Sequence, residues 1–183
     1  MTIKAISVII VDNHITLKRF SHDADQAKYE AIIASREHLL PWLPWARFYD
    51  SPKQMEEFTE SQIKAFDDGR IIGYDIFYDG SFAGSIDLHD ISEANHSAEI
   101  GYWLNFDQTG KGIMTKVTSA ITSYAFNELN FHRITILAAT KNTASCAIPE
   151  RLGFDREGTL RGAIILDNIY YDEAVYAKIK TER

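Results

Sequence analysis

Hydrophobic and polar residues alternate with a period of two in several segments of the chain, which is the pattern of half-buried β-strands. Near the start, 6–11 and 15–20 alternate in this way around the turn residues Asp12 and Asn13, so they predict a strand pair. Later segments with the same pattern predict strands over 72–78, 82–91, 98–104, 133–139, 154–160 and 168–179. Asp79 and Gly80 favour a type I′ hairpin turn between the first two of these later strands.

Apolar residues instead recur every three to four positions in other segments, as they do in amphipathic helices. These segments predict helices over 23–40, 51–68, 111–129 and 143–152. Ser21 or Asp23 can cap the first helix, Pro41 stops it, and Gly69 ends the second. The order of these elements predicts one α+β domain over 1–183, with a mixed sheet flanked by helices.

Composition narrows the class of protein. The chain has 183 residues, of which 45% are hydrophobic and 25% charged, as in ordinary globular domains. It shows no signal peptide and no apolar run near the roughly 20 residues of a membrane helix, so we expect a cytoplasmic protein without a membrane partner. The net charge of −7 argues against direct nucleic-acid binding and suits a cationic acceptor, although many acidic proteins are simply soluble. The single cysteine, Cys146, excludes an intramolecular disulfide and a multi-cysteine metal site, and we expect no metal.

Gly110-Lys111-Gly112 lies between a predicted strand and a predicted helix, where an anion can bind. Glycines let backbone N–H groups approach a phosphate, and a helix N-terminus carries free donors and positive partial charge. A Walker A loop would need glycine at Asn105 and Ser or Thr at Gly112, and a dinucleotide fingerprint would need glycine at Thr115. Neither motif fits, and the loop taken alone could equally be a structural turn.

Four motifs occur in order along the chain: Ala98-Glu99-Ile100-Gly101-Tyr102-Trp103, Gly110-Lys111-Gly112-Ile113-Met114-Thr115, Asn142-Thr143-Ala144-Ser145 and Arg151-Leu152-Gly153-Phe154. Together they resemble the GNAT superfamily of N-acetyltransferases, and within it the ribosomal-protein N-acetyltransferases of the RimJ/RimL type. The resemblance spans about 14–180. It implies a GNAT-like domain in which the central strand splays from its neighbour and acetyl-CoA, the cosubstrate, lies in the resulting V.

The resemblance also implies which residues bind the cosubstrate. The amides of the glycine loop would hold the pyrophosphate, the end of the central strand would pair with the pantetheine arm, and Asn142 would orient that arm. The positions concerned are Tyr102, Trp103, Leu104, Gln108, Thr109, Gly110, Lys111, Gly112 and Ile113. The family often has Gln or Arg where this chain has Asp107, a departure that bears on affinity because backbone donors bind phosphate whatever the side chain.

Acetyl transfer to an amine needs a group that takes the amine proton. Glu99 is the first candidate base, since strand alternation turns it to the face opposite Ile100. The alternative is a solvated or ion-paired glutamate. His89, with Asp87 and Asp90 nearby, is the rival base, although a histidine at a strand end is often a structural hydrogen-bonding residue.

Protonation of the departing thiolate needs a second group. Many relatives place a tyrosine seven residues after the motif asparagine, and here that position is Pro149. Ser145 stands where RimL-like members offer a serine, so we predict it as the acid or as a hydrogen-bond donor to the thiolate; a helix-surface or capping serine is the alternative. RimL-like members can also carry a glutamate where this chain has Ile164, so their acid–base set is incomplete here. Cys146 is expected to be a buried structural thiol.

The resemblance places Trp42, Trp45 and Phe48 on the acceptor side, where rigid indoles could shape a substrate groove. They could equally be core residues or a contact between copies of the chain, which leaves a homo-oligomer open. We therefore expect an N-acetyltransferase that moves acetyl from acetyl-CoA to a primary amine by direct attack in a ternary complex. A ribosomal or other protein N-terminus is the first acceptor expected. A polyamine or aminoglycoside-like amine is one alternative, and a non-catalytic CoA-binding regulatory domain is another.

Overall fold

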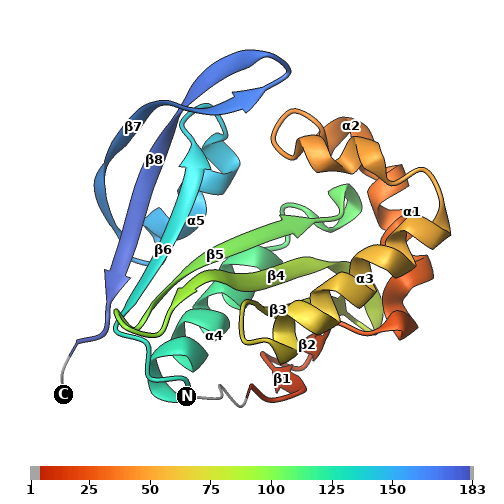
Figure 1. Ribbon diagram of the computed structural model, residues 1–183, viewed down its shortest axis with the longest axis horizontal. Helices are drawn as coiled ribbons and strands as arrows, with labels where there is room; N and C mark the ends of the chain where they lie inside the picture. Colours follow the sequence, from red (N-terminus) through yellow and green to blue (C-terminus); the bar gives the residue numbers. More distant parts are fainter. Residues whose placement is uncertain (1–4, 182–183) are drawn as a thin grey trace.

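An eight-stranded mixed sheet organises the computed structural model, which describes residues 5–181 (Figure 1). Its strand order is β1-β2-β3-β4-β5-β6-β8-β7. The strands are β1 Val8–Ile10, β2 Ile15–Arg19, β3 Ile72–Tyr78, β4 Ser81–Ser92, β5 Ser97–Leu104, β6 Arg133–Ala139, β7 Asp155–Leu166 and β8 Ile169–Ile179. All neighbouring strands are antiparallel except β5 and β6, so this parallel pair is where the chain crosses over through a helix.

Within residues 5–181, five α-helices and three short 3-10 helices connect the strands. They are η1 His22–Ala24, α1 Asp25–Ala34, α2 Arg36–Leu39, η2 Pro44–Phe48, α3 Pro52–Asp67, η3 Phe106–Gln108, α4 Ile113–Asn127 and α5 Thr143–Arg151. The core on the α4 and α5 side contains Ile100, Ile121 and Cys146, whereas α1 and α3 pack together and contact β4 and β3. Among residues 5–181, no helix is long and apolar enough to cross a bilayer.

The α+β fold with a mixed sheet is confirmed, and every predicted strand and helix is present. The hairpin turn is also as predicted, because Asp79 and Gly80 both have positive φ, at 48° and 81°. Ser51 caps α3 by accepting a hydrogen bond from the Gln54 amide, but Ser21 makes no side-chain cap at η1.

Two element boundaries were wrong. The predicted helix over 23–40 is broken at Ser35, whose hydroxyl bonds to the chain that follows β5. The predicted strand over 154–160 continues to Leu166, because its pairing with β8 shifts register between Leu160 and Ile164. Such a bulge interrupts the period of two, so the hydrophobic pattern stops before the strand does.

A buried ion pair joins α1 to the sheet on the side opposite α4. Lys28 Nζ lies 3.0 Å from Asp75 Oδ1 of β3, and both side chains are almost fully buried. The Ser85 hydroxyl of β4 donates to the same carboxylate oxygen over 3.1 Å. Lys28 also lies over the ring of Phe20, 4.6 Å from its centroid. This arrangement ties α1 to β3 by charge rather than by apolar contact alone.

Candidate active site

The sheet opens between β5 and β6. In the described chain these strands pair at Ser97, Ala98 and Glu99, whereas β5 stays paired with β4 as far as Leu104. Figure 1 shows β5 and β6 parting from a common base. The peptide groups of β5 beyond Glu99 therefore form a strand edge inside the sheet, and such an edge binds an extended ligand through backbone hydrogen bonds. The splay expected from the sequence is confirmed.

The glycine loop follows the open end of β5. Gly110 and Gly112 have φ of 75° and 74°, and a Cβ at either position would meet no atom within 4 Å, so conformation rather than crowding selects glycine here. Gly112 is the N-cap of α4 and provides no side chain to cap its first amides. Lys111 Nζ lies 2.8 Å from Gln108 Oε1, at the same helix end. This geometry suits a phosphate group.

Ser35 fixes the chain between β5 and this loop. Its hydroxyl donates to Asn105 Oδ1 over 3.0 Å and accepts from the Phe106 amide over 2.9 Å. Asn105 in turn accepts from the Asp107 amide and so caps η3. The break between α1 and α2 thus positions the loop, a role that the hydrophobic pattern of 23–40 does not indicate.

Glu99 and His89 face each other across β5 and β4. His89 Nε2 lies 3.4 Å from Glu99 Oε1, and His89 Nδ1 lies 2.7 Å from Asp87 Oδ1. The hydrogen bonds to Asp87 and then to Glu99 raise the pKa of His89 to about 10. The imidazole is therefore protonated at neutral pH and cannot accept the amine proton, which favours Glu99 over His89 as the candidate base.

Replacing His89 by glutamine should cost stability in a pH-dependent way. Because its folded-state pKa lies above the ordinary value of 6.5, its protonation stabilises the native state fully below about pH 6.5, and this contribution disappears as pH rises through about 10. We expect the difference in free energy of unfolding between wild type and His89→Gln to shrink steadily across this window. Urea denaturation at several pH values measures it, and a pH-independent difference would contradict the assigned protonation.

Glu173 is a second carboxylate at the opening, and the sequence reasoning missed it. It lies on β8, opposite Ala139 of β6, and alternation turns it away from Ala174 and Tyr176, which pack in the core. Burial and then the negative charge of Glu99 raise its pKa. The alternating pattern of 168–179 was the available signal, because it places Glu173 on the sheet face opposite the core residues of its own strand.

Ser145 and Tyr102 meet across the opening, one from α5 and one from β5. The Tyr102 hydroxyl lies 3.2 Å from Ser145 Oγ and 3.1 Å from the Ser145 carbonyl oxygen. Burial raises the pKa of Tyr102 to about 12. Asn142 accepts a hydrogen bond from the Ser145 amide over 3.1 Å, so its carboxamide oxygen caps α5. The structure thus brings the candidate acid next to a phenol that the sequence reasoning assigned only to cofactor binding.

Comparison with known proteins agrees with this geometry. The family model of the acetyltransferase (GNAT) domain matches residues 14–155. The chain belongs to the GNAT family of N-acetyltransferases. YdaF of Bacillus subtilis, a candidate ribosomal N-acetyltransferase, is 34% identical over 176 residues, which cover 94% of each chain.

Two solved structures of acetyltransferases have the same fold as this GNAT chain. RimL, a ribosomal L7/L12 alpha-N-protein acetyltransferase in complex with coenzyme A, superposes with a TM-score of 0.91 at 26% identity, covering 94% of this chain and 97% of RimL. MccE, a microcin C7 self immunity acetyltransferase in complex with acetyl-CoA and AMP, also has a TM-score of 0.91, at 27% identity, covering 97% of this chain and 98% of MccE.

In this GNAT chain the tryptophan-rich segment meets the β7–β8 hairpin. The rings of Trp42 and Tyr171 form a T-shaped pair with their centroids 6.4 Å apart. Arg47 pairs with Asp167 at the hairpin tip, with 2.5 Å between Nη2 and Oδ1. Figure 1 shows the hairpin extending toward α2 above the opening. Trp45 instead forms a T-shaped pair with Trp103 of β5, with 6.0 Å between the ring centroids. The two predicted acceptor residues therefore have different surroundings, Trp42 at the hairpin and Trp45 against the sheet.

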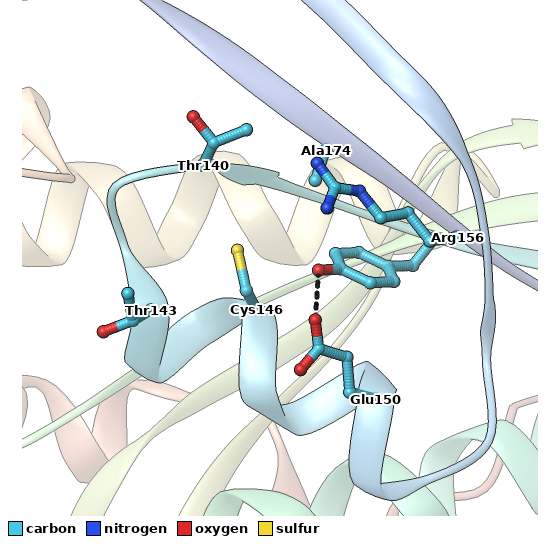
Figure 2. Close-up of a pocket in the computed structure, with 7 residues that line it drawn as sticks. Thr140, Thr143, Cys146, Glu150, Arg156 and Ala174 are labelled. Carbon is cyan, nitrogen blue, oxygen red and sulfur yellow. Dashed lines mark hydrogen bonds between the residues drawn. The ribbon is translucent and has the colours of Figure 1, made fainter.

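A separate pocket of about 200 Å³ lies between α5 and strands β7 and β8. Figure 2 shows the Cys146 thiol pointing into it, with Glu150 on the same helix. The Tyr176 hydroxyl donates a hydrogen bond to Glu150 Oε1 over 2.8 Å. Cys146 is buried, as predicted, and its sulfur lies 3.6 Å from the Ala139 carbonyl oxygen. This pocket opens on the α5 side of the sheet, away from the face that Glu99 and Glu173 share.

Proposed function

We propose that this chain acetylates the N-terminal amine of a ribosomal or other protein, using acetyl-CoA in a ternary complex. The observation that carries the proposal is the opening between β5 and β6. Glu99 lies where the two strands part, and the glycine loop follows the far end of β5. One opening thus joins an anion-binding helix end to a candidate base, as a reaction between a CoA thioester and an amine requires.

The residues around the opening fit acetyl-CoA. The uncapped amides at the start of α4 and the Lys111 ammonium suit its pyrophosphate, and the free edge at Tyr102–Leu104 suits its pantetheine amides. The complexes of RimL with coenzyme A and of MccE with acetyl-CoA support this assignment. When bound, the molecule supplies the thioester; the protein supplies alignment and proton handling.

Each group near the thioester then has a distinct task. Glu99 takes the proton of the attacking amine, directly or through water, while the His89 imidazolium holds its carboxylate in place. Glu173 adds a second negative charge that attracts a cationic acceptor and stands in for the acid missing at Ile164. Ser145 donates a hydrogen bond to the thiolate as the C–S bond breaks. The thiolate takes its proton from solvent as CoASH leaves, and Glu99 releases the amine proton to solvent, so protons balance over the turnover.

A relative supports the proposed acceptor. RimL is named for acetylating a protein N-terminus. Here the β7–β8 hairpin contacts Trp42 and Arg47 beside the opening, which suits an acceptor that enters as a chain end. A small-molecule amine is the second candidate, since MccE binds the small molecule AMP together with acetyl-CoA. A cytoplasmic location, expected from the sequence, fits either acceptor.

Release of CoASH tests the proposal. The protein is incubated with acetyl-CoA and one of three acceptors: a peptide with a free N-terminus and no lysine, the same peptide blocked at its N-terminus and carrying an internal lysine, or spermidine. We expect thiol release and a mass gain of one acetyl group with the first peptide above the other two. Faster turnover of spermidine would favour the small-amine function. Binding of acetyl-CoA without turnover of any acceptor would favour the regulatory alternative.

Removing the loop cation should weaken cosubstrate binding alone. Lys111→Ala deletes a charge-assisted contact to the pyrophosphate, so we expect the Kd for CoA to rise about tenfold. Calorimetric titration with CoA measures the change. Lys53→Ala on α3 is the matched control, because it removes the same charge from an exposed lysine on another element, where it pairs with Glu57. An unchanged Kd for Lys111→Ala would place the pyrophosphate elsewhere.

A further inference from the structure

Pro149 gives α5 an unusual feature next to the candidate acid. In an α-helix each amide donates to the carbonyl four residues earlier, and proline has no amide hydrogen. The Ser145 carbonyl therefore receives no hydrogen bond from position 149. Tyr102 of β5 places its hydroxyl 3.1 Å from that carbonyl oxygen, where it donates in place of the missing amide.

The same phenol also orients the Ser145 side chain. Ser145 Oγ lies 3.2 Å from the Tyr102 oxygen. A phenol has one hydrogen, and when that hydrogen goes to the carbonyl, the serine hydroxyl becomes the donor between the two oxygens. Tyr102 lies on the part of β5 that is paired with β4 but not with β6, and Ser145 lies in the first turn of α5, the helix that follows β6. The two hydroxyls thus bridge the two arms of the opening, at the level where the pantetheine arm is proposed to run.

We propose that Tyr102 is a positioning residue that holds the Ser145 hydroxyl ready to donate to the departing thiolate, a role that rests on the proposed function. As the C–S bond breaks, its electron pair stays on sulfur, and Ser145 turns its hydrogen from Tyr102 to the thiolate. Tyr102 keeps its own proton, as its burial favours. The chain thereby does without the tyrosine that relatives carry at position 149: Pro149 removes that hydroxyl and also frees the carbonyl on which Tyr102 is anchored.

Kinetics of single and double variants test whether Tyr102 acts through Ser145. Tyr102→Phe keeps the ring and removes the hydroxyl, so we expect kcat to fall about five- to tenfold with the KM for acetyl-CoA within about twofold. Ser145→Ala should lower kcat at least as much, and the double variant should be no slower than Ser145→Ala. Normal turnover of Ser145→Ala would overturn its role in the proposed function. A slow Ser145→Ala combined with multiplicative losses in the double variant would overturn only the role of Tyr102.

Pro149→Ala separates positioning from helix capping. In the Tyr102→Phe background it restores an amide at position 149, which can donate to the Ser145 carbonyl. We expect Tyr102→Phe to lower Tm, and the double variant to restore Tm while kcat stays low. Recovery of kcat would show that Tyr102 serves only to cap the carbonyl. Tyr74→Phe is the matched control, because its buried hydroxyl also donates to a main-chain carbonyl, that of Ile6, away from the opening. Tyr74→Phe should have a lower Tm than wild type and an unchanged kcat.

Discussion

Replacing Glu99 by glutamine is expected to lower kcat about 100-fold, a typical loss for removal of a general base. The substitution keeps the size of the side chain and leaves an amide that cannot take the amine proton. His89 is not expected to substitute, because Asp87, which contributes most to raising its pKa, remains its hydrogen-bond partner in the variant. Steady-state rates of CoASH release with saturating acetyl-CoA and acceptor measure the effect, and a kcat within about threefold of wild type would remove Glu99 from the mechanism.

The pH dependence of the Glu99→Gln defect gives a second measurement. Without the base, the reaction depends on hydroxide or buffer to remove the amine proton. The ratio of wild-type kcat to Glu99→Gln kcat should therefore decrease as pH rises from about 7 to 9. Glu173→Gln is the matched control, since it removes the same charge from the same opening. There we expect a higher KM for a cationic acceptor and a kcat within about tenfold of wild type, because Glu173 is proposed to attract the acceptor rather than to take its proton.

Local patterns predicted most of the fold. The strands 72–78 and 133–139 have the predicted bounds, since their alternation is regular and each ends at a clear turn. The break at Ser35 could not be predicted, because it depends on hydrogen bonds to Asn105 and Phe106, about seventy residues away in the chain. The extension of β7 was hidden by a bulge, which shifts the alternation without ending the strand.

In the candidate site, too, local features could be predicted from the sequence, whereas features that depend on distant residues could not. The glycine loop is local, so its positive φ angles and its place before α4 followed from the motif. The choice between Glu99 and His89 stayed open in the sequence, because the protonation of His89 depends on carboxylates from two strands. Only part of the Tyr102–Ser145 contact can be predicted from the sequence. Pro149 indicates that the Ser145 carbonyl lacks a donor within the helix, but only the fold shows that the Tyr102 hydroxyl donates to it.

Lys28→Met is expected to lower the free energy of unfolding by about 3–5 kcal/mol, the usual cost of removing one member of a buried ion pair. Methionine fills a similar volume, so the loss reflects the Asp75 carboxylate left uncompensated in a site that is about 1% exposed. Urea denaturation measures it. Lys53→Met, which breaks the exposed pair with Glu57, should cost less than about 0.5 kcal/mol, because solvent screens that interaction.

Two further measurements identify the buried charge as the cause. Burial raises the pKa of Asp75 to about 6 even with Lys28 present, and without Lys28 this pKa should rise further. A carboxyl with a raised folded-state pKa destabilises the native state progressively as pH rises from its ordinary value of 3.8 to the raised one. The deficit of Lys28→Met should therefore be largest near neutral pH and shrink toward pH 5. Adding Asp75→Leu removes the charge, and the double variant should recover most of the loss. A deficit that is independent of pH, or that Asp75→Leu deepens, would mean that Lys28 acts through its contact with the Phe20 ring and its packing instead.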